Sequence, residues 1–313
     1  MKIVFFGTPD YVLPILDKLH SNFKVKGESP ITAIVTQPPK PVGRNKIITY
    51  SPVDNWAHKR GVQKYYDPKE LIKSDIVADL GILASYGEII SKDVIDYFPK
   101  GILNIHFSLL PKYRGASPVH ASIIAKDKEC GVSIIKLDEK LDHGPIISQF
   151  KEEIRNDDTT QKLRLRLFNV TAEVLVTLLP KYVRGKITPR MQNHKKATYT
   201  RIIKKQDGFI PPKYINSALE GKSINEKWSI DFIKGYSTIP NADVIDRFVK
   251  AMNPWPIAWT KVTTDNKKNV KRLKIINTHL SGNKLIIDNI QLEGKNEVGW
   301  DQFKQGYPTF TLE

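Results

Sequence analysis

Short apolar runs and a stretch of helical periodicity alternate in the first part of the chain. Met1–Phe6, Ile31–Thr36 and Asp79–Ala84 are each typical of a buried strand, because apolar side chains dominate them. Between the first two runs, apolar residues recur at helical spacing from Val12 to Leu19. Strands that alternate with helices favour an α/β domain with a parallel sheet. We therefore expect a Rossmann-like, doubly wound and mostly parallel sheet.

The turn after the first run argues against a dinucleotide site. It contains Gly7 but not the other glycines of G-x-G-x-x-G. Pro14 lies inside the helical pattern that follows. Because proline removes a backbone hydrogen bond, we expect it to bend this helix or to delay its start.

The last third of the chain has a different pattern. Strand-like runs occur at Ala258–Thr263, Arg272–Asn277 and Lys284–Leu292. Successive short strands suggest a small β-barrel of OB type. We therefore divide the chain into residues 1–187, a basic linker at 188–206, and a smaller OB-like domain at 207–313.

One strand of the first part points polar side chains to one face. Apolar residues alternate with Asn104, His106 and Ser108, and side chains alternate across a strand. The next β-branched run, Val132–Leu137, leads into a loop that carries Asp142. An amide, an imidazole and a carboxylate that converge at the end of a sheet could stabilise an oxyanion and move protons at a carbonyl group.

The same residues also fit a structural role. A histidine on a strand often donates to a backbone carbonyl, and an aspartate in a loop often caps a turn. His143 follows Asp142 directly. Its side chain either adds a titrating group near the site or faces solvent, and we expect the second. Spacing alone leaves the catalytic and the structural interpretation open.

A longer motif favours the catalytic interpretation. N-x-H-x-S-L-L-P-x-x-x-G begins at Asn104, and L-D-x-G-x-I follows from Leu141. These two motifs resemble the folate-dependent formyltransferase superfamily, and the opening MKIVFFGTPDYVLPIL resembles its methionyl-tRNA branch. The resemblance implies an α/β catalytic domain, an OB-like domain that binds tRNA, and 10-formyltetrahydrofolate as formyl donor.

The resemblance also assigns roles to particular residues. It implies that Asn104, His106 and Asp142 are catalytic. It implies that the donor is bound by two segments, which are the loop Ser108, Leu109, Leu110 and Pro111 and the A-x-Y-G segment with Ala84, Tyr86 and Gly87. Tyr86 also fits simple packing in the core.

A loop rich in proline, glycine and positive charge follows the second strand. T-Q-P-x-x-P-x-G-R, from Thr36 to Arg44, matches the methionyl-tRNA branch, in which this loop contacts the acceptor end of the initiator tRNA. The resemblance therefore implies tRNA contacts by Lys40, Arg44 and Lys46, with Arg44 as the leading candidate. The alternative is a solvated, mobile loop.

A second basic stretch lies in the predicted linker. No acidic residue occurs between Val174 and Gln206. Basic residues with two interleaved tyrosines suit the backbone of a nucleic acid, so we expect tRNA contacts from Arg190, Lys195 and Lys196. The alternative is again a solvated linker.

Composition limits the remaining classes. The net charge of +16 favours an anionic partner such as nucleic acid, although a generally lysine-rich proteome would give the same total. No apolar run is long enough for a membrane span, and no His/Cys cluster suggests a metal. With a single cysteine, Cys130, and no signal-peptide pattern, we expect a cytoplasmic enzyme. We also expect a monomer.

The function that the resemblance implies is formyl transfer from 10-formyltetrahydrofolate to the α-amino group of methionyl initiator tRNA, for translation initiation. Three alternatives stay open. They are a formyltransferase acting on an amino-sugar nucleotide, a hydrolase of 10-formyltetrahydrofolate, and a non-catalytic RNA-binding protein.

Overall fold

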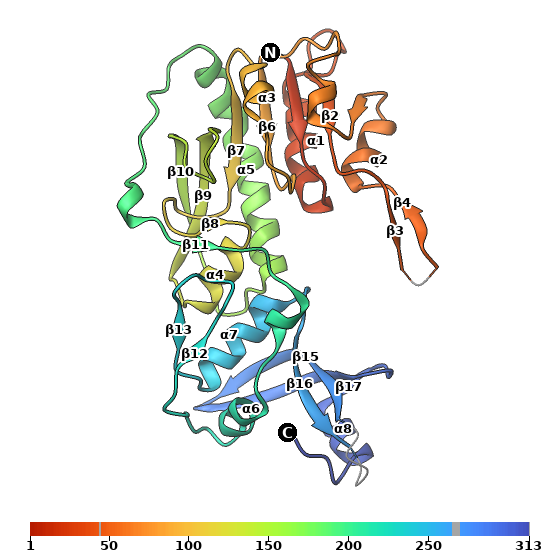
Figure 1. Ribbon diagram of the computed structural model, residues 1–313, viewed down its shortest axis with the longest axis vertical. Helices are drawn as coiled ribbons and strands as arrows, with labels where there is room; N and C mark the ends of the chain where they lie inside the picture. The colour runs from red at the N-terminus through yellow and green to blue at the C-terminus, as the bar shows by residue number, and fades with distance from the viewer. Residues whose placement is uncertain (44, 265–269, 313) are drawn as a thin grey trace. The chain divides into compact units, whose positions relative to one another are not determined.

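The computed structural model describes residues 1–313 except residues 44, 265–269 and 313 (Figure 1). It forms two compact units, each assembled from separate segments. Unit 1 contains residues 1–114, 131–152 and 164–197, and unit 2 contains residues 115–130, 153–163 and 198–313. The functional boundaries at residues 187 and 206 stay predictions.

A seven-stranded sheet forms the centre of unit 1, with the strand order β10-β9-β7-β6-β1-β2-β5. β1 pairs in parallel with both β2 and β6, as do β2 with β5 and β6 with β7, whereas β7 and β9 are antiparallel. This confirms the mostly parallel α/β sheet. The strands are β1 (Ile3–Phe6), β2 (Ile31–Val35), β5 (Gln63–Tyr65), β6 (Leu80–Leu83), β7 (Ile102–His106), β9 (Glu129–Lys136) and β10 (Ile146–Glu153).

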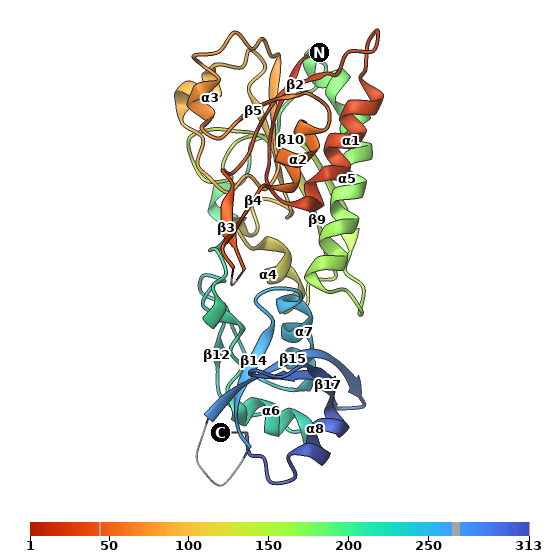
Figure 2. The same cartoon turned by 90° about the vertical axis from the view of Figure 1, so that its right-hand side faces the viewer.

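Helices cover both faces of this sheet. Val4 and Phe6 join one apolar cluster with residues of α3 (Lys92–Asp96), while the alternating residues of β1 point to the other face. On that other face α1 (Leu13–Asn22) lies beside α5 (Thr160–Val183), as Figure 2 shows. The two helices are joined by an ion pair between Lys18 and Glu173 of 2.6 Å. α2 (Pro52–His58) also belongs to unit 1.

The proline expected to disturb the first helix lies at its start. A 3₁₀ turn, Asp10–Val12, precedes α1, and Pro14 is the second residue of α1. At that position the missing N–H removes no helical hydrogen bond. Of the two effects expected of Pro14, the structure therefore shows the delayed start of the helix.

The basic segment after β2 is a hairpin and not the irregular loop that its composition suggests. β3 (Lys40–Val42) pairs antiparallel with β4 (Ile47–Thr49) (Figure 1). All six of these residues are exposed. Pro41 is tolerated in β3 because both strands are at an edge and face water.

The order of the strands reverses beside β1, because the chain runs outward through β2 and β5 and then returns to β6 and β7. In open α/β sheets such a reversal leaves a crevice at the carboxyl ends of the strands, where ligands bind. A Cβ atom at Gly7, directly after β1, would lie 2.9 Å from the carbonyl oxygen of Ala84 after β6. The glycine therefore allows the chain to pass close between these two ends.

Unit 2 is built around an antiparallel four-stranded sheet, β14-β15-β16-β17, which confirms the expected C-terminal β domain. α7 (Ala242–Met252) packs on this sheet with one apolar face, and Asn241 caps its first turn by accepting from the N–H of Val244 at 2.9 Å. The strands are β12 (Trp228–Ser229), β13 (Ser237–Thr238), β14 (Ala258–Thr263), β15 (Val270–Ser281), β16 (Lys284–Leu292) and β17 (Glu297–Gly299). The other helices are α4 (Pro118–Ile124), α6 (Pro212–Leu219) and α8 (Trp300–Gly306).

Short elements complete the chain. β8 (Arg114–Gly115) and β11 (Tyr199–Thr200) are two-residue strands. Further 3₁₀ turns lie at Pro68–Glu70, His194–Lys196 and Lys205–Gly208. No helix within the described ranges has the length and apolar character needed to cross a bilayer.

A partly buried ion pair fixes the start of the C-terminal part of unit 2. Arg201 donates to both carboxylate oxygens of Asp207, at 2.7 and 2.8 Å, and the N–H of Lys204 donates to the same carboxylate. Burial by itself would raise the pKa of Asp207, but these hydrogen bonds outweigh it and hold that pKa below its ordinary value. Bidentate, charge-assisted bonds of this kind are the strong ones in proteins.

We expect Asp207→Asn to lower the free energy of unfolding by about 1 to 3 kcal/mol at neutral pH, because it removes charge-assisted bonds to this carboxylate. A carboxyl group whose pKa is lowered in the folded state stabilises the fold at pH values above its ordinary pKa. This stabilisation is lost as the pH falls through the pKa of the folded state. Urea unfolding at pH 7 and pH 3 measures both effects. The difference from wild type should shrink at pH 3, and Asp301→Asn, on an exposed carboxylate, should change little.

Candidate active site

Three polar side chains meet at the carboxyl end of β7. Asn104 and His106 lie on this strand with exposed fractions of 8% and 6%, and they point to the same face because they are two residues apart. Asp142 lies in the loop after β9, with 8% exposure and a left-handed φ of 46°. The structure thus brings together Asn104 and His106, which the strand pattern places on one face, and Asp142 from the loop after the next strand.

Their contacts are short and specific. The amide nitrogen of Asn104 donates to Oδ1 of Asp142 at 3.1 Å. Nδ1 of His106 lies 3.4 Å from Oδ2 of the same carboxylate. Nε2 of His106 lies 2.9 Å from the backbone carbonyl of Tyr113.

Both ring nitrogens of His106 face hydrogen-bond acceptors. One nitrogen faces the carboxylate of Asp142 and the other faces the backbone carbonyl oxygen of Tyr113. The imidazole ring therefore lies between two acceptor groups at the end of β7, and the amide of Asn104 bonds the same carboxylate.

The loop that carries Asp142 is fixed by a residue that the sequence did not reveal. Gln192 is buried, and its amide nitrogen donates to the carbonyl oxygens of Asp142 at 2.9 Å and Gly144 at 2.8 Å. Its amide oxygen accepts from Arg114 at 2.8 Å. A Cβ atom at Gly144 would lie 1.9 Å from the carbonyl oxygen of Lys136, so the loop requires glycine there. Gln192 lies about fifty residues from Asp142 along the chain, and no local pattern indicates the contact.

His143 does not simply face solvent. Its Nδ1 lies 2.7 Å from a carboxylate oxygen of Asp138, and its ring stacks on that of His194 at 3.9 Å between centroids. Desolvation and the nearby positive charges of His143 and Arg114 lower the pKa of His194. The expectation of a solvent-facing His143 was therefore wrong.

The side chain of Ser133 bonds to the backbone of the predicted donor loop, Ser108–Pro111. It is fully buried, donates to the carbonyl oxygen of Ser108 at 2.7 Å, and accepts from the N–H of Leu110 at 3.0 Å. The amide of Gln149 donates to the hydroxyl of Ser133 at 2.8 Å and to the carbonyl of Leu110 at 3.1 Å. Arg190 then donates to the amide oxygen of Gln149 at 2.8 Å.

These bonds connect the loop to three side chains that sequence reasoning did not assign to it. Ser133 and Gln149 carried no motif signal, and Arg190 was predicted to contact tRNA because it lies in a basic stretch. The structure places part of the guanidinium of Arg190 on Gln149. A tRNA contact by Arg190 stays a prediction.

The second predicted donor segment lies at the same edge of the sheet. β6 and β7 are parallel and Leu83 is in register with Asn104, so Ala84 follows β6 beside the catalytic candidates. Tyr86 is 1% exposed and packs edge-on against Phe6, and burial raises its pKa. Its side chain belongs to the core, and Gly87 follows with a left-handed φ of 93°. Contact of this segment with the donor stays a prediction.

The predicted tRNA contacts lie on exposed segments of unit 1. Lys40 is on β3, where its ammonium donates to Gln37 at 3.2 Å, and Lys46 precedes β4 with φ of 48°. Lys195 and Lys196 are exposed in a 3₁₀ turn. Arg44 lies outside the described residues.

We expect Ser133→Ala to raise about tenfold the KM for the folate donor that the resemblance implies. The change leaves the N–H of Leu110 and the carbonyl of Ser108 without the hydroxyl that they bond, and each such loss costs about 1 to 3 kcal/mol. Steady-state kinetics with the donor varied measure this change. Ser122→Ala is the matched control, since Ser122 is also buried but bonds only to a backbone carbonyl within α4. Equal KM values for both variants would contradict the proposed support of the loop.

Comparison with known proteins agrees with this geometry. The model of the formyl transferase family matches residues 1–179. A methionyl-tRNA formyltransferase of Buchnera aphidicola subsp. Schizaphis graminum is 34% identical over 266 residues, which cover 83% of this chain and 74% of the relative. One from Dictyoglomus thermophilum is 32% identical, and the match covers 98% of this chain and 97% of the relative.

Solved structures share the fold. The methionyl-tRNA formyltransferase from Clostridium thermocellum aligns with a TM-score of 0.56 at 15% identity, over 93% of this chain and 98% of the other. An N-formyltransferase from Helicobacter canadensis, solved with folinic acid and dTDP-3-aminofucose, aligns with a TM-score of 0.61 at 15% identity, over 96% and 98% of the two chains. At these identities the likeness concerns the fold alone.

Proposed function

Because this chain belongs to the formyl transferase family, we propose that it transfers a formyl group from 10-formyltetrahydrofolate to the α-amino group of methionyl initiator tRNA. The products are N-formylmethionyl-tRNA and tetrahydrofolate. The observation that carries the proposal is the convergence of Asn104, His106 and Asp142 at the carboxyl end of β7. Relatives that span nearly the whole chain support tRNA as the acceptor.

The reaction begins when the free amine of the methionyl group attacks the formyl carbon. A new carbon–nitrogen bond forms, and the formyl oxygen takes up negative charge. The second N–H of the Asn104 amide and the Nε2–H of His106 are placed to stabilise this oxyanion, since the first amide hydrogen already bonds Asp142. For this, His106 exchanges the carbonyl of Tyr113 for the substrate oxygen. Donors aimed at the developing charge provide the largest contribution in such reactions.

The second step breaks the bond between the formyl carbon and N10 of the folate. His106 donates its proton to N10 as that nitrogen leaves with the bonding electrons. Asp142 faces Nδ1 of His106 and orients the ring, and its carboxylate accepts the proton that the attacking amine loses, through water. The one proton that the amine loses thus balances the one proton that N10 of the leaving folate gains.

Binding of the donor involves the loop Ser108, Leu109, Leu110 and Pro111 together with the backbone of Ala84, Tyr86 and Gly87. Both segments lie at the same sheet edge as His106, and the loop is fixed by Ser133. Holding donor and acceptor in one orientation can contribute about 7 to 11 kcal/mol to the acceleration.

We expect Lys46→Ala to weaken the use of tRNA and to reduce the salt dependence of its KM. The logarithmic slope should change by about one for each phosphate that the protein no longer neutralises. Kinetics at several salt concentrations measure the slope. Lys26→Ala is the matched control, because Lys26 is also exposed and has a similar left-handed φ of 51°. An equal slope for both variants would contradict the assignment of the β3–β4 hairpin.

The nearest alternative is transfer to an amino-sugar nucleotide, since an N-formyltransferase solved with dTDP-3-aminofucose shares the fold. The experiment supplies labelled 10-formyltetrahydrofolate with methionyl-tRNA, with an amino-sugar nucleotide, or with no acceptor. We expect label in the tRNA alone. Label in the sugar nucleotide, or release of formate without an acceptor, would overturn the proposal.

The remaining assignments follow from this function. Residues 1–187 act as the catalytic domain, and residues 207–313 bind tRNA beyond the basic linker at 188–206. Further tRNA contacts come from Lys40, Arg44, Lys46, Arg190, Lys195 and Lys196. We expect the chain to work as a monomer in the cytoplasm, where translation begins. Size-exclusion chromatography with light scattering tests the monomer.

A further inference from the structure

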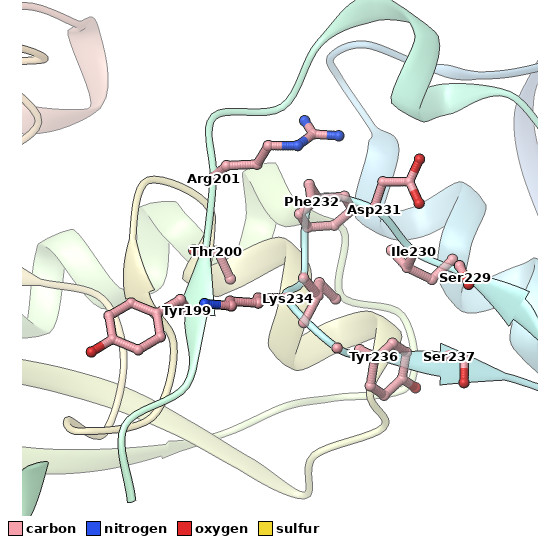
Figure 3. Close-up of a pocket in the computed structure, with 12 residues that line it drawn as sticks. Tyr199, Thr200, Arg201, Ser229, Ile230, Asp231, Phe232, Lys234, Tyr236 and Ser237 are labelled. Carbon is pink, nitrogen blue, oxygen red and sulfur yellow. The ribbon is translucent and has the colours of Figure 1, made fainter. Parts of the chain in front are cut away.

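Unit 2 contains a pocket of about 750 Å³ apart from the candidate active site. Two segments form it, Tyr199–Arg201 and Ser229–Ser237, and Figure 3 shows their side chains around the hollow. Its volume lies within the range of roughly 300 to 1,000 Å³ that is typical of small-molecule sites. A pocket of this size has room for a nucleotide.

Backbone hydrogen bonds fix the shape of this pocket. The N–H of Arg201 donates to the carbonyl of Phe232 at 2.9 Å, and the N–H of Lys234 donates to the carbonyl of Tyr199 at 3.0 Å. Phe232 and Ile233 are buried, with 1% and 4% exposure, and anchor the second segment. The two segments therefore hold their geometry before any ligand binds.

An exposed aromatic ring and an ammonium group lie next to each other at one side. Tyr199 is 38% exposed, and Nζ of Lys234 lies 5.8 Å from the centroid of its ring (Figure 3). Among the residues that the structure describes, no carboxylate forms an ion pair with Lys234. A tyrosine face suits stacking by a nucleobase, and a lysine beside it suits the attached phosphate.

Polar groups at the other side suit a sugar. Asp231, Ser229 and Ser237 are exposed and line the pocket there (Figure 3). A carboxylate accepts hydrogen bonds from ribose hydroxyls, as in many nucleotide sites, and contact to the 2′-OH distinguishes RNA from DNA. Arg201 has a different role, because Asp207 already neutralises its guanidinium and fixes the first segment.

We propose that this pocket binds one unpaired ribonucleotide of the RNA substrate, with the base on Tyr199, the phosphate on Lys234 and the ribose near Asp231. The inference rests on the proposed function, which supplies an RNA with unpaired nucleotides. The pocket contacts an unstacked base and the 2′-OH. The exposed lysines of unit 1 do not provide such contacts. Stacking of this kind tolerates different bases.

The test uses the full chain and a fluorescein-labelled pentamer of riboadenylate, with binding followed by fluorescence anisotropy. We expect Tyr199→Ala and Lys234→Ala each to weaken binding about tenfold, the size typical of removing one stacked base. Both should also raise the KM for methionyl-tRNA. Wild type should bind the riboadenylate pentamer more tightly than its deoxy counterpart, and Asp231→Ala should remove that preference.

Matched variants distinguish binding in the pocket from attraction of the RNA by positive charge alone. Tyr199→Phe keeps the ring and should bind as wild type does. Lys261→Ala removes another exposed lysine, which lies 5.9 Å from the ring of Phe209 in the same unit, and should have no effect. If Tyr199→Ala does not fold, Lys234→Ala still provides the test, because Lys234 is exposed.

Unchanged pentamer binding by Lys234→Ala and Tyr199→Ala would overturn the proposal, as would equal affinity for the ribose and deoxyribose pentamers. Failure of the proposed function has a different signature. Wild type would then formylate no tRNA, while the dependence of pentamer binding on Tyr199 would still support the pocket.

Discussion

Replacing His106 by alanine should lower kcat by about 10² to 10⁴-fold, with little change in the affinity for tRNA. General acid catalysis by a positioned side chain contributes an acceleration of this size, and His106 supplies the proton for N10 in the proposed mechanism. Its ring is buried, and its two nitrogens face groups of unit 1, the carboxylate of Asp142 and the carbonyl of Tyr113. Single-turnover rates with saturating tRNA, together with filter binding, measure the two quantities separately.

His58→Ala is the control for this experiment. His58 is exposed in the last turn of α2, far from the end of β7 along the chain. We expect it to keep the wild-type rate. A His106→Ala variant that also keeps near-normal turnover would contradict the catalytic assignment, while a weaker affinity for tRNA in that variant would indicate a structural role.

Replacing Asp142 by asparagine should lower kcat by a factor of about 10² or more while leaving the fold intact. The change keeps the shape of the side chain and the backbone bonds that Gln192 makes to this loop. It removes the negative charge that faces Nδ1 of His106.

Stability distinguishes this mechanism from general loss of structure. Because the substitution keeps the shape of the side chain, Asp142→Asn should unfold at the same urea concentration as wild type while its rate falls. Asp96→Asn changes an exposed carboxylate that pairs with Lys92 on the surface, and it should leave rate and stability unchanged. An Asp142→Asn variant with the wild-type rate would contradict the role of the carboxylate.

The elements that periodicity describes were predictable. The central strands of unit 1 and the helix α7 bury continuous apolar stripes, and such patterns depend only on neighbours in the sequence. The alternation of Asn104 and His106 along β7 likewise placed both side chains on one face. Asp142 joined them because it follows a strand that pairs with β7.

The supporting contacts were not predictable from local pattern. Gln192 and Arg190 lie in a stretch without acidic residues, where every basic side chain looks like a phosphate ligand. In the structure, Arg190 reaches Gln149 and Gln192 reaches the loop of Asp142. Both bonds join residues that are far apart in the sequence, so only the folded chain reveals them. The β3–β4 hairpin was missed for another reason, since its prolines and glycine indicate an irregular loop.

The most direct test of the proposed activity is single-turnover formylation of methionyl initiator tRNA with 10-formyltetrahydrofolate, with methionyl elongator tRNA in parallel. We predict fast transfer to the initiator and slow transfer to the elongator, because we propose that the hairpin and the basic linker contact features outside the methionyl group. Fast transfer to both would keep the chemistry of Asn104, His106 and Asp142 and contradict the tRNA contacts. No transfer to either tRNA would contradict the central claim that these three residues formylate methionyl-tRNA.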